Sequence, residues 1–187
     1  KKAKKSGYRA RSAFKLEEID KKDKLLRPGL NVVDLGAAPG GWCQYARKKL
    51  GKKSRLIAVD LLPIEPIEGV EIIQGDFTEE QVRQQINDMV DNKAFDLVLS
   101  DMAPNISGIA LADQARSIGL AEGVLDWSLS VLAVDGGLLM KVFQGSGFDP
   151  LRKEILSNFR SVAVRKPGAS RSRSAEVYLL ARGFKGI

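Results

Sequence analysis

The stretch Asp34-Leu-Gly-Ala-Ala-Pro-Gly-Gly-Trp42 decides the fold. It follows an apolar run at residues 30–33 with the character of a strand, and it precedes a helical stretch at residues 44–50. A strand that passes through a glycine-rich turn into a helix is how doubly wound α/β folds hold nucleotide-like ligands, because glycine lets the backbone approach the ligand closely. Ala38 stands where the dinucleotide fingerprint G-x-G-x-x-G has its second glycine. The turn therefore predicts a nucleotide-like ligand other than a dinucleotide.

The chain is long enough, at 187 residues, for one domain with a substantial core. We expect a single domain over residues 1–187, with a basic N-terminal segment at 1–27 that contains a helix and an α/β core at 28–187. No stretch approaches the ~20 apolar residues of a membrane span, and nothing at the start resembles a signal peptide. We therefore expect a cytoplasmic protein without a membrane partner. We also expect a monomer.

Cysteine and histidine usage restricts the chemistry. Cys43 is the only cysteine, and histidine is absent. A zinc site is disfavoured on this ground, and we expect no metal. A general base has to come from Asp, Glu, Lys, Tyr or Cys.

Charge is divided into three blocks along the chain. Residues 1–27 carry 11 Lys and Arg against 4 acidic residues, and residues 152–187 carry 9 against 2. Residues 28–151 carry 10 basic against 17 acidic residues. Two basic ends around an acidic middle predict binding to RNA or DNA through phosphate contacts. A solvated lysine-rich tail would explain the first five residues equally well.

Apolar runs alternate with amphipathic stretches along most of the chain. The runs typical of strands buried on both faces are Asn31–Leu35, Arg55–Val59, Val70–Gln74, Phe95–Ser100, Gly137–Phe143, Ser161–Arg165 and Glu176–Ala181. The helical stretches are marked by Val82, Ile86, Met89 and Val90, by Ile118, Ala121, Leu125, Leu129 and Leu132, and by Leu151, Ile155 and Phe159. We expect the last of these helices to begin with Asp149 as N-cap and Pro150 as its first residue. The alternation predicts an α/β, Rossmann-like fold with a mostly parallel sheet and helices on both faces.

Both ends of the chain depart from this alternation. A basic loop without a helix separates the last two predicted strands, so we expect them to pair as a C-terminal antiparallel hairpin in a seven-stranded sheet. Before the first strand, residues 12–20 form a predicted helix that carries Phe14, Leu16 and Ile19. This helix comes too early to belong to the alternating core.

Four aspartates stand at the ends of successive predicted strands, namely Asp34, Asp60, Asp76 and Asp101. Ligands in open α/β sheets bind beyond the carboxyl ends of the strands. We expect Asp34 to brace the glycine turn, Asp60 to take a ribose hydroxyl pair and Asp76 to accept a hydrogen bond from an adenine amino group. Any one of these residues alone would be explained as a cap of a loop or helix. The four together predict a cofactor site.

Lys141 is a charge inside an otherwise apolar strand. Buried lysines are rare without a partner or a purpose. A structural ion pair with Asp101 is one interpretation. The other is a chemical role, for which desolvation favours a neutral amine whereas nearby carboxylates oppose it.

Motifs in a fixed order carry a resemblance to a known family. The glycine turn with Pro39 resembles the first motif of S-adenosylmethionine (SAM) methyltransferases. The matching segments are Arg11–Ile19, Val33–Trp42, Asp60–Pro63, Gln74–Phe77, Ser100–Gly108, Lys141–Gly145, Arg165–Pro167, Ser170–Arg173 and Glu176–Tyr178. Together they resemble the FtsJ/RrmJ family of ribosomal RNA 2′-O-ribose methyltransferases, in its large-subunit methyltransferase E group, over nearly the whole chain. The resemblance implies a SAM-dependent methyltransferase fold, SAM as cofactor and S-adenosylhomocysteine as product.

The resemblance also implies roles for individual residues. The family's catalytic set of Lys, Asp, Lys and Glu falls on Lys15, Asp101, Lys141 and Glu176. The candidate cofactor-binding residues are Asp34, Gly36, Pro39, Gly40, Gly41, Trp42, Asp60, Asp76, Phe77 and Asp101. The candidate RNA-binding residues are Lys4, Lys5, Arg9, Arg11, Arg165, Lys166, Arg171 and Arg173. For Trp42, packing in the core beside Ala46 and Leu50 is an alternative.

By this resemblance the chain transfers a methyl group from SAM to the ribose 2′-hydroxyl of a uridine in the A-loop of 23S rRNA, with the 50S subunit as partner. Lys141 would orient the hydroxyl and accept its proton or stabilise the developing alkoxide, with Asp101 and Glu176 positioning it and Lys15 biasing its charge. Transfer to tRNA or to an mRNA cap is an alternative, and so is a non-catalytic RNA-binding ribosome assembly factor. A base methyltransferase is disfavoured, because residues 101–105 lack the paired prolines and the aromatic residue of amino-methylating enzymes.

Overall fold

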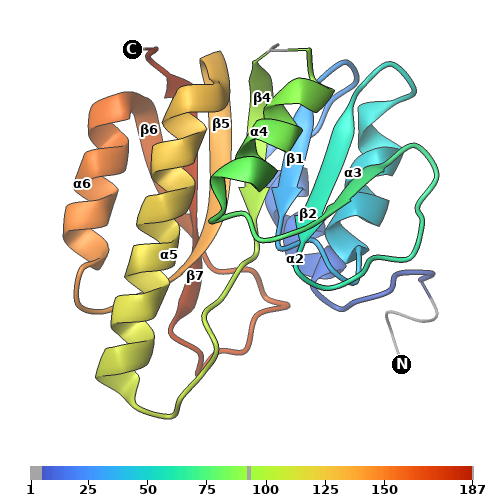
Figure 1. The fold of residues 1–187 in the computed structure, drawn as a ribbon. Helices are drawn as coiled ribbons and strands as arrows, with labels where there is room; N and C mark the ends of the chain where they lie inside the picture. Colours follow the sequence, from blue (N-terminus) through green and yellow to red (C-terminus); the bar gives the residue numbers. More distant parts are fainter. Residues whose placement is uncertain (1–5, 92–93, 187) are drawn as a thin grey trace.

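The computed structural model describes residues 6–91 and 94–186, so Lys4 and Lys5 of the predicted RNA-binding set lie outside the described residues. Seven strands form one sheet with helices on both faces (Figure 1). The strands are β1 (Val32–Leu35), β2 (Leu56–Asp60), β3 (Glu71–Gln74), β4 (Phe95–Ser100), β5 (Leu132–Phe143), β6 (Phe159–Arg165) and β7 (Glu176–Phe184). The helices are α2 (Ala13–Asp23), α3 (Gly41–Leu50), α4 (Glu80–Met89), α5 (Ala110–Val131) and α6 (Phe148–Asn158). None of the described helices is long and apolar enough to cross a membrane.

The sheet has the strand order β3-β2-β1-β4-β5-β7-β6. Strands β1 to β5 pair in parallel, whereas β7 runs antiparallel to both of its neighbours, β5 and β6. The last strand of the chain is therefore inserted inside the sheet and is not added at its edge. This arrangement confirms the predicted seven-stranded, mostly parallel sheet with a C-terminal antiparallel hairpin.

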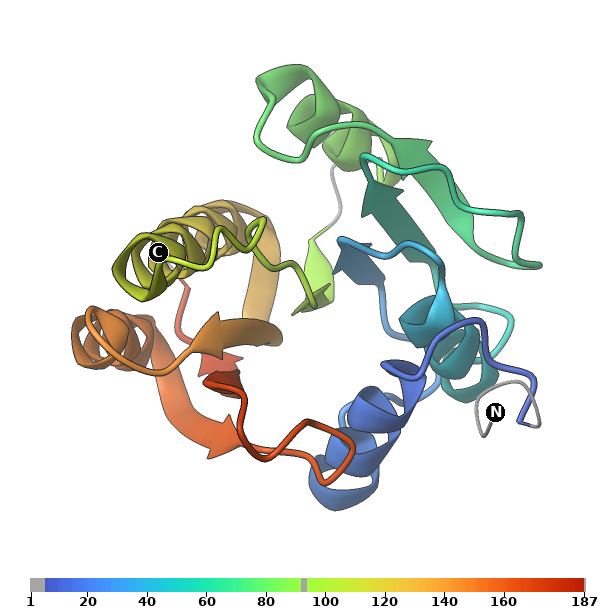
Figure 2. The ribbon, with the colours of Figure 1, turned by 90° about the horizontal axis from the view of Figure 1, so that it is seen from below.

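Helices lie on opposite faces of the sheet in the view of Figure 2, and an apolar core lies beneath each group of helices. One core packs α4, α5 and α6 against the sheet, through residues that include Ile86, Leu125 and Ile155. The other packs α2 and α3 through residues that include Leu16 and Leu50. The early helix α2 thus has its own place in the fold, because its apolar side covers the sheet beside α3.

Helix α6 begins earlier than the sequence predicts. Gly147, with a φ of +87°, is the N-cap in place of Asp149. Glycine adopts this left-handed conformation without the steric cost that a side chain would add. Pro150 still falls in the first turn, where its missing N–H needs no partner. Phe159, predicted within this helix, is instead the first residue of β6.

Candidate functional site

Four charged side chains meet at the carboxyl edge of the sheet. Asp101 directly follows β4, Lys141 lies in β5, Glu176 opens β7 and Lys15 comes from α2. Lys141 Nζ lies 3.0 Å from Asp101 Oδ1 and 3.3 Å from Glu176 Oε2. Lys15 Nζ lies 2.7 Å from Glu176 Oε1. We call these four residues the charged cluster. It contains the predicted ion pair of Lys141 with Asp101 and extends it to a second carboxylate and a second lysine.

The pairing of β5 with β7 explains why these side chains converge. Lys141 lies opposite Tyr178, and Phe143 lies opposite Glu176. Directly paired residues share a face of the sheet, and so do residues two apart on one strand. This is the face that α2 and α3 cover, since Leu139 and Tyr178 belong to the core beneath those helices. Lys15 on α2 therefore meets Glu176 across the gap between helix and sheet.

The charged cluster is shielded from water. The side chain of Lys141 is 11% exposed and that of Glu176 is 13% exposed. Burial by itself would raise the pKa of Glu176, but the hydrogen bond from Lys15 and the positive charges of both lysines outweigh burial and hold this pKa below its ordinary value. Glu176 is therefore a charged carboxylate that bridges the two lysines, with one oxygen bound to each of them.

A pocket of about 830 Å³ adjoins the charged cluster along the ends of β1 to β4. The predicted cofactor residues that line it are Gly36, Asp60, Asp76, Phe77 and Asp101. Wall residues that the sequence did not single out include Met102, Asn105 and Arg116. Among the residues that the structure describes, no group of three or more His, Cys, Asp or Glu is placed to hold a metal ion.

Asp60 braces the glycine turn, which corrects the role predicted for Asp34. Asp60 Oδ2 accepts a hydrogen bond from the Ala38 N–H at 2.8 Å, inside the turn. Asp34 instead lies buried in β1, where its Oδ2 accepts a hydrogen bond from the Cys43 thiol at 3.1 Å. Burial is the main reason that the pKa of Asp34 is raised to about 8.

The remaining residues of the turn support the pocket without lining it. The predicted cofactor residues outside the lining are Asp34, Pro39, Gly40, Gly41 and Trp42. Gly40 has a φ of +114° and is the N-cap of α3, and a Cβ there would lie 2.7 Å from Ile67 Cδ1. Trp42 is buried, and its indole N–H donates to the Ser12 carbonyl at 2.8 Å. The core-packing alternative therefore describes the Trp42 side chain.

With this geometry in view, comparison with known proteins decides the family. The model of the FtsJ-like methyltransferase family matches residues 8–184. The chain belongs to this family. The predicted resemblance is thereby confirmed, and with it the expectation of a methyltransferase.

Named relatives of this FtsJ-like methyltransferase cover almost its whole length. The protein named ribosomal RNA large subunit methyltransferase E of Stutzerimonas stutzeri is 54% identical, over 100% of this chain and 90% of the relative. The protein of the same name from Azoarcus sp. is 58% identical, over 93% of this chain and 85% of the relative. A crystal structure from Plasmodium falciparum, described as a ribosomal RNA methyltransferase, superposes with a TM-score of 0.87 at 27% identity and covers 96% of this chain and 100% of the other.

The structure adds two residues to the charged cluster of this FtsJ-like enzyme. The Tyr178 hydroxyl, fully buried, donates to Asp101 Oδ1 at 2.6 Å. Burial and then the charge of Asp101 raise the pKa of Tyr178, so the phenol keeps its proton and acts as a donor. Ser170 Oγ lies 3.4 Å from Glu176 Oε1. Sequence reasoning gave neither residue a role, because a tyrosine in a buried strand and a serine in a basic loop look like packing and solvation.

Arg9, predicted to contact RNA, makes hydrogen bonds that hold the glycine turn in place. Its guanidinium donates to the carbonyl oxygens of Glu65 at 2.6 Å, Pro66 at 2.9 Å and Pro39 at 3.3 Å. Its backbone N–H donates to Gln44 Oε1 at 2.8 Å. Arg9 thus ties the segment before α2 to the glycine turn and to the loop between β2 and β3.

The other basic residues fall into two groups. Arg165 pairs with Asp23 at 2.8 Å, and Lys166 donates to the Ser174 carbonyl at 2.8 Å, so both shape the loop between β6 and β7. The remaining described members of the predicted RNA-binding set are exposed, namely Arg11, Arg171 and Arg173. Arg9 and Lys166 are exposed as well, so the assignment of these residues to RNA stays a prediction.

Proposed function

We propose that this FtsJ-like methyltransferase transfers a methyl group from SAM to a ribose 2′-hydroxyl of large-subunit ribosomal RNA. The names of its full-length relatives at 54% and 58% identity support the RNA class. The finer target that we propose is a uridine in the A-loop of 23S rRNA, on the 50S subunit, and the place of action is the cytoplasm. The single observation that carries the proposal is that Asp101 both lines the 830 Å³ pocket and contacts Lys141 at 3.0 Å, so the pocket and the charged cluster form one site.

The pocket fits a nucleoside cofactor. Its volume lies within the usual range for small-molecule sites. Asp76 accepts hydrogen bonds from the Thr78 hydroxyl and N–H, which lower its pKa and keep it charged at the pocket wall. We assign Asp60 to the ribose hydroxyls and Asp76 to the adenine amino group, because both need acceptors. When bound, SAM supplies a methyl group on a sulfonium, which is already activated for transfer.

In this proposal the charged cluster binds and orients the ribose 2′-hydroxyl that accepts the methyl group. A ribose 2′-hydroxyl is a weak nucleophile, so the protein has to orient its oxygen and assist the loss of its proton. Lys141 donates a hydrogen bond to that oxygen and stabilises the negative charge that develops there as the hydroxyl proton passes to water. The oxygen bonds to the methyl carbon while the methyl–sulfur bond breaks, and the electron pair of that bond stays on the sulfur of S-adenosylhomocysteine. Asp101 and Glu176 fix the amine of Lys141 between them, and Lys15 balances the charge of Glu176. The low exposure of the cluster keeps these interactions strong.

The test is to map the methylated nucleotide in ribosomal RNA treated with the enzyme and radiolabelled SAM. Ribose methylation makes one internucleotide bond resistant to alkali, and that resistance is the result that we expect. Label that alkali releases with ordinary nucleotides would show base methylation. Label on tRNA or capped mRNA but not on ribosomal RNA would show that the enzyme acts on another of the RNA classes that the family methylates. No label at all would favour a non-catalytic assembly factor.

Reversing the charge of Arg171 and Arg173 to Glu should weaken RNA binding and flatten its salt dependence. Each cationic contact to a single strand contributes about 0.7 to the slope of log affinity against log salt, so loss of both should lower the slope by roughly one to two. Arg152 and Lys153, exposed on α6, provide a matched control for the same double reversal. Titration of RNA at several salt concentrations measures the slope. Equal slopes for both double variants would remove the loop from the RNA footprint.

Replacing Arg9 with Ala should lower the affinity for SAM by about tenfold while leaving the salt slope of RNA binding unchanged. The reason is that the guanidinium donates hydrogen bonds to three backbone carbonyl groups, and these bonds fix the glycine turn. Replacement with Lys should not rescue the affinity, because an ammonium lacks the planar fork of donors. Calorimetric titration with SAM reports the first effect. A lowered salt slope with normal SAM affinity would instead make Arg9 an RNA contact.

A further inference from the structure

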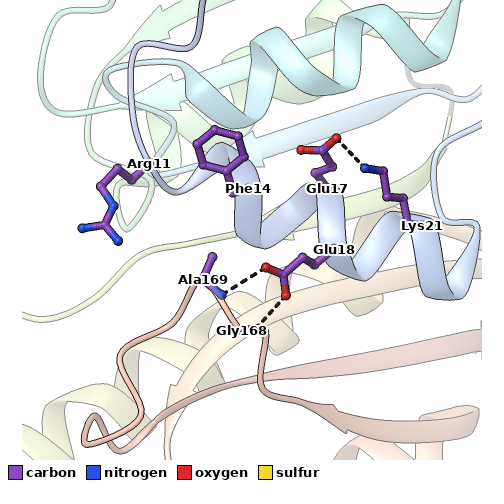
Figure 3. A pocket seen from close by; sticks show the side chains of 7 residues that line it. All are labelled: Arg11, Phe14, Glu17, Glu18, Lys21, Gly168 and Ala169. Atoms are coloured by element: carbon purple, nitrogen blue, oxygen red, sulfur yellow. Dashed lines mark hydrogen bonds and ion pairs between the residues drawn. The ribbon is translucent and has the colours of Figure 1, made fainter. Parts of the chain in front are cut away.

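A second pocket, of about 500 Å³, opens between α2 and the loop that joins β6 to β7 (Figure 3). Its lining residues are Arg11, Phe14, Glu17, Glu18, Lys21, Gly168 and Ala169. It shares no lining residue with the cofactor pocket. We call it the helix–loop pocket.

The walls of the helix–loop pocket are fixed to each other. The Glu18 carboxylate accepts hydrogen bonds from the Gly168 N–H at 2.6 Å and from the Ala169 N–H at 3.1 Å, as Figure 3 shows. A second tie joins the end of α2 to β6, where Asp23 and Arg165 pair at 2.8 Å. These contacts fix the position of the loop relative to the helix. The pocket is therefore formed without a bound ligand.

Each wall of the helix–loop pocket contains a residue that directly precedes, in the chain, a residue in contact with Glu176. On the helix wall, Phe14 directly precedes Lys15, which contacts Glu176. On the loop wall, Ala169 directly precedes Ser170, which contacts the same carboxylate. The helix–loop pocket and the charged cluster are therefore built on the same two segments, α2 and the loop between β6 and β7.

The lining offers the groups that single-stranded RNA uses. Phe14 is a partly exposed aromatic residue, and its ring meets Tyr8 edge to face at a centroid distance of 5.6 Å. Arg11 and Lys21 stand at opposite ends of the pocket in Figure 3. Lys21 pairs with Glu17 at 2.8 Å, so we assign the phosphate contact to Arg11. Unpaired bases stack on aromatic side chains and hydrogen-bond through their edges. Glu17 pairs with Lys21 through Oε1 at 2.8 Å, and its second oxygen can accept a hydrogen bond from the amino group of a base.

We propose that the helix–loop pocket binds the base of an unpaired nucleotide that flanks the methylated one, stacked on Phe14 with its phosphate near Arg11. The inference rests on the proposed function, because it takes RNA as the substrate. It extends that function by adding a subsite that fixes the register of the strand. A flanking base held here sets which ribose reaches Lys141, so the pocket contributes to the choice of nucleotide.

The test is a double-mutant cycle between the enzyme and the RNA. An RNA fragment that contains the mapped target is prepared with an abasic site at each neighbouring position in turn. With the wild-type enzyme, one abasic position should raise KM by about tenfold, the scale of one base stacked on an aromatic ring. Phe14→Ala should raise KM on intact RNA to a similar extent, and the abasic site should then add nothing. Phe14→Tyr keeps a stacking ring and should restore both KM and its sensitivity to the abasic site.

Two controls keep the result specific. Calorimetric affinity for SAM should be unchanged in Phe14→Ala, and Arg152→Ala on α6 should behave as wild type throughout. A KM for Phe14→Ala within twofold of wild type, or an undiminished abasic penalty in this variant, would overturn the inference. In that case alkali-resistant methylation by the wild type still supports the proposed function. Absence of any ribose methylation by the wild type would defeat the proposed function itself.

Discussion

Replacing Lys141 with Ala should lower kcat for ribose methylation by about a thousandfold or more while SAM still binds. The variant removes the amine that lies 3.0 Å from Asp101 Oδ1 and 3.3 Å from Glu176 Oε2, and with it the contact proposed for the substrate oxygen. Positioned acid–base groups contribute about 10²–10⁴ to rate, and electrostatic stabilisation of a developing oxyanion adds to this. Transfer of radiolabel into alkali-resistant RNA measures kcat, and calorimetry measures SAM binding.

Two further variants separate chemistry from folding. Lys141→Arg retains the charge but changes the position of the donors, so it should not restore the rate. Lys153→Ala removes an exposed lysine on α6 and should leave rate and SAM binding as in the wild type. A kcat of Lys141→Ala near the wild-type value would contradict the catalytic role that we assign to Lys141. Loss of SAM binding together with a lowered melting temperature would show that the ion pairs are structural.

Gly36→Ala should weaken SAM binding by at least about tenfold. Gly36 has a φ of +72°, a conformation that costs other residues roughly 1–2 kcal/mol. A Cβ at this position would also overlap Met102 Cγ and lie 3.4 Å from Met102 Cα. Because Met102 lines the cofactor pocket, its displacement changes the shape of the pocket. Calorimetric titration with SAM measures the loss.

Gly123→Ala is the matched control for this change. Gly123 lies in α5, outside the pocket lining, and a Cβ there would meet nothing within 4 Å. Alanine is also a better helix former than glycine, so this variant should unfold at the same or a slightly higher temperature and bind SAM normally. Equal SAM affinity for Gly36→Ala and wild type would mean that Met102 moves aside at no cost to the pocket.

Local sequence patterns were sufficient to predict the sheet and most of the site. The strands and the glycine turn follow from short-range rules of periodicity and backbone conformation, so residues 31–35 and 95–100 were placed closely. The resemblance brought Lys15 to the site from α2, although Lys15 lies 161 residues from its partner Glu176. Composition alone would not have joined them.

Other features depend on contacts that no local pattern encodes. The partners of Arg9 are backbone carbonyls, which every residue type offers, so no sequence pattern indicates these contacts. That Asp60 and not Asp34 braces the turn depends on which carboxylate reaches the Ala38 N–H, and no pattern in the sequence gives this distance. The helix–loop pocket forms only where Glu18 meets Gly168, 150 residues further on.

Because β7 is the last strand of the chain but lies inside the sheet, the active site can form only after β7 has been synthesised. Strands emerge from the ribosome in chain order, and β5 is complete long before residues 176–184 are made. Until then β5 lacks its antiparallel neighbour along Leu138–Phe143, and an unpaired strand edge of this kind is open to wrong pairing. Lys141 in turn lacks Glu176, and Asp101 lacks Tyr178. A nascent or C-terminally shortened chain is therefore unable to assemble the charged cluster, so only a chain that extends through β7 can carry the reaction.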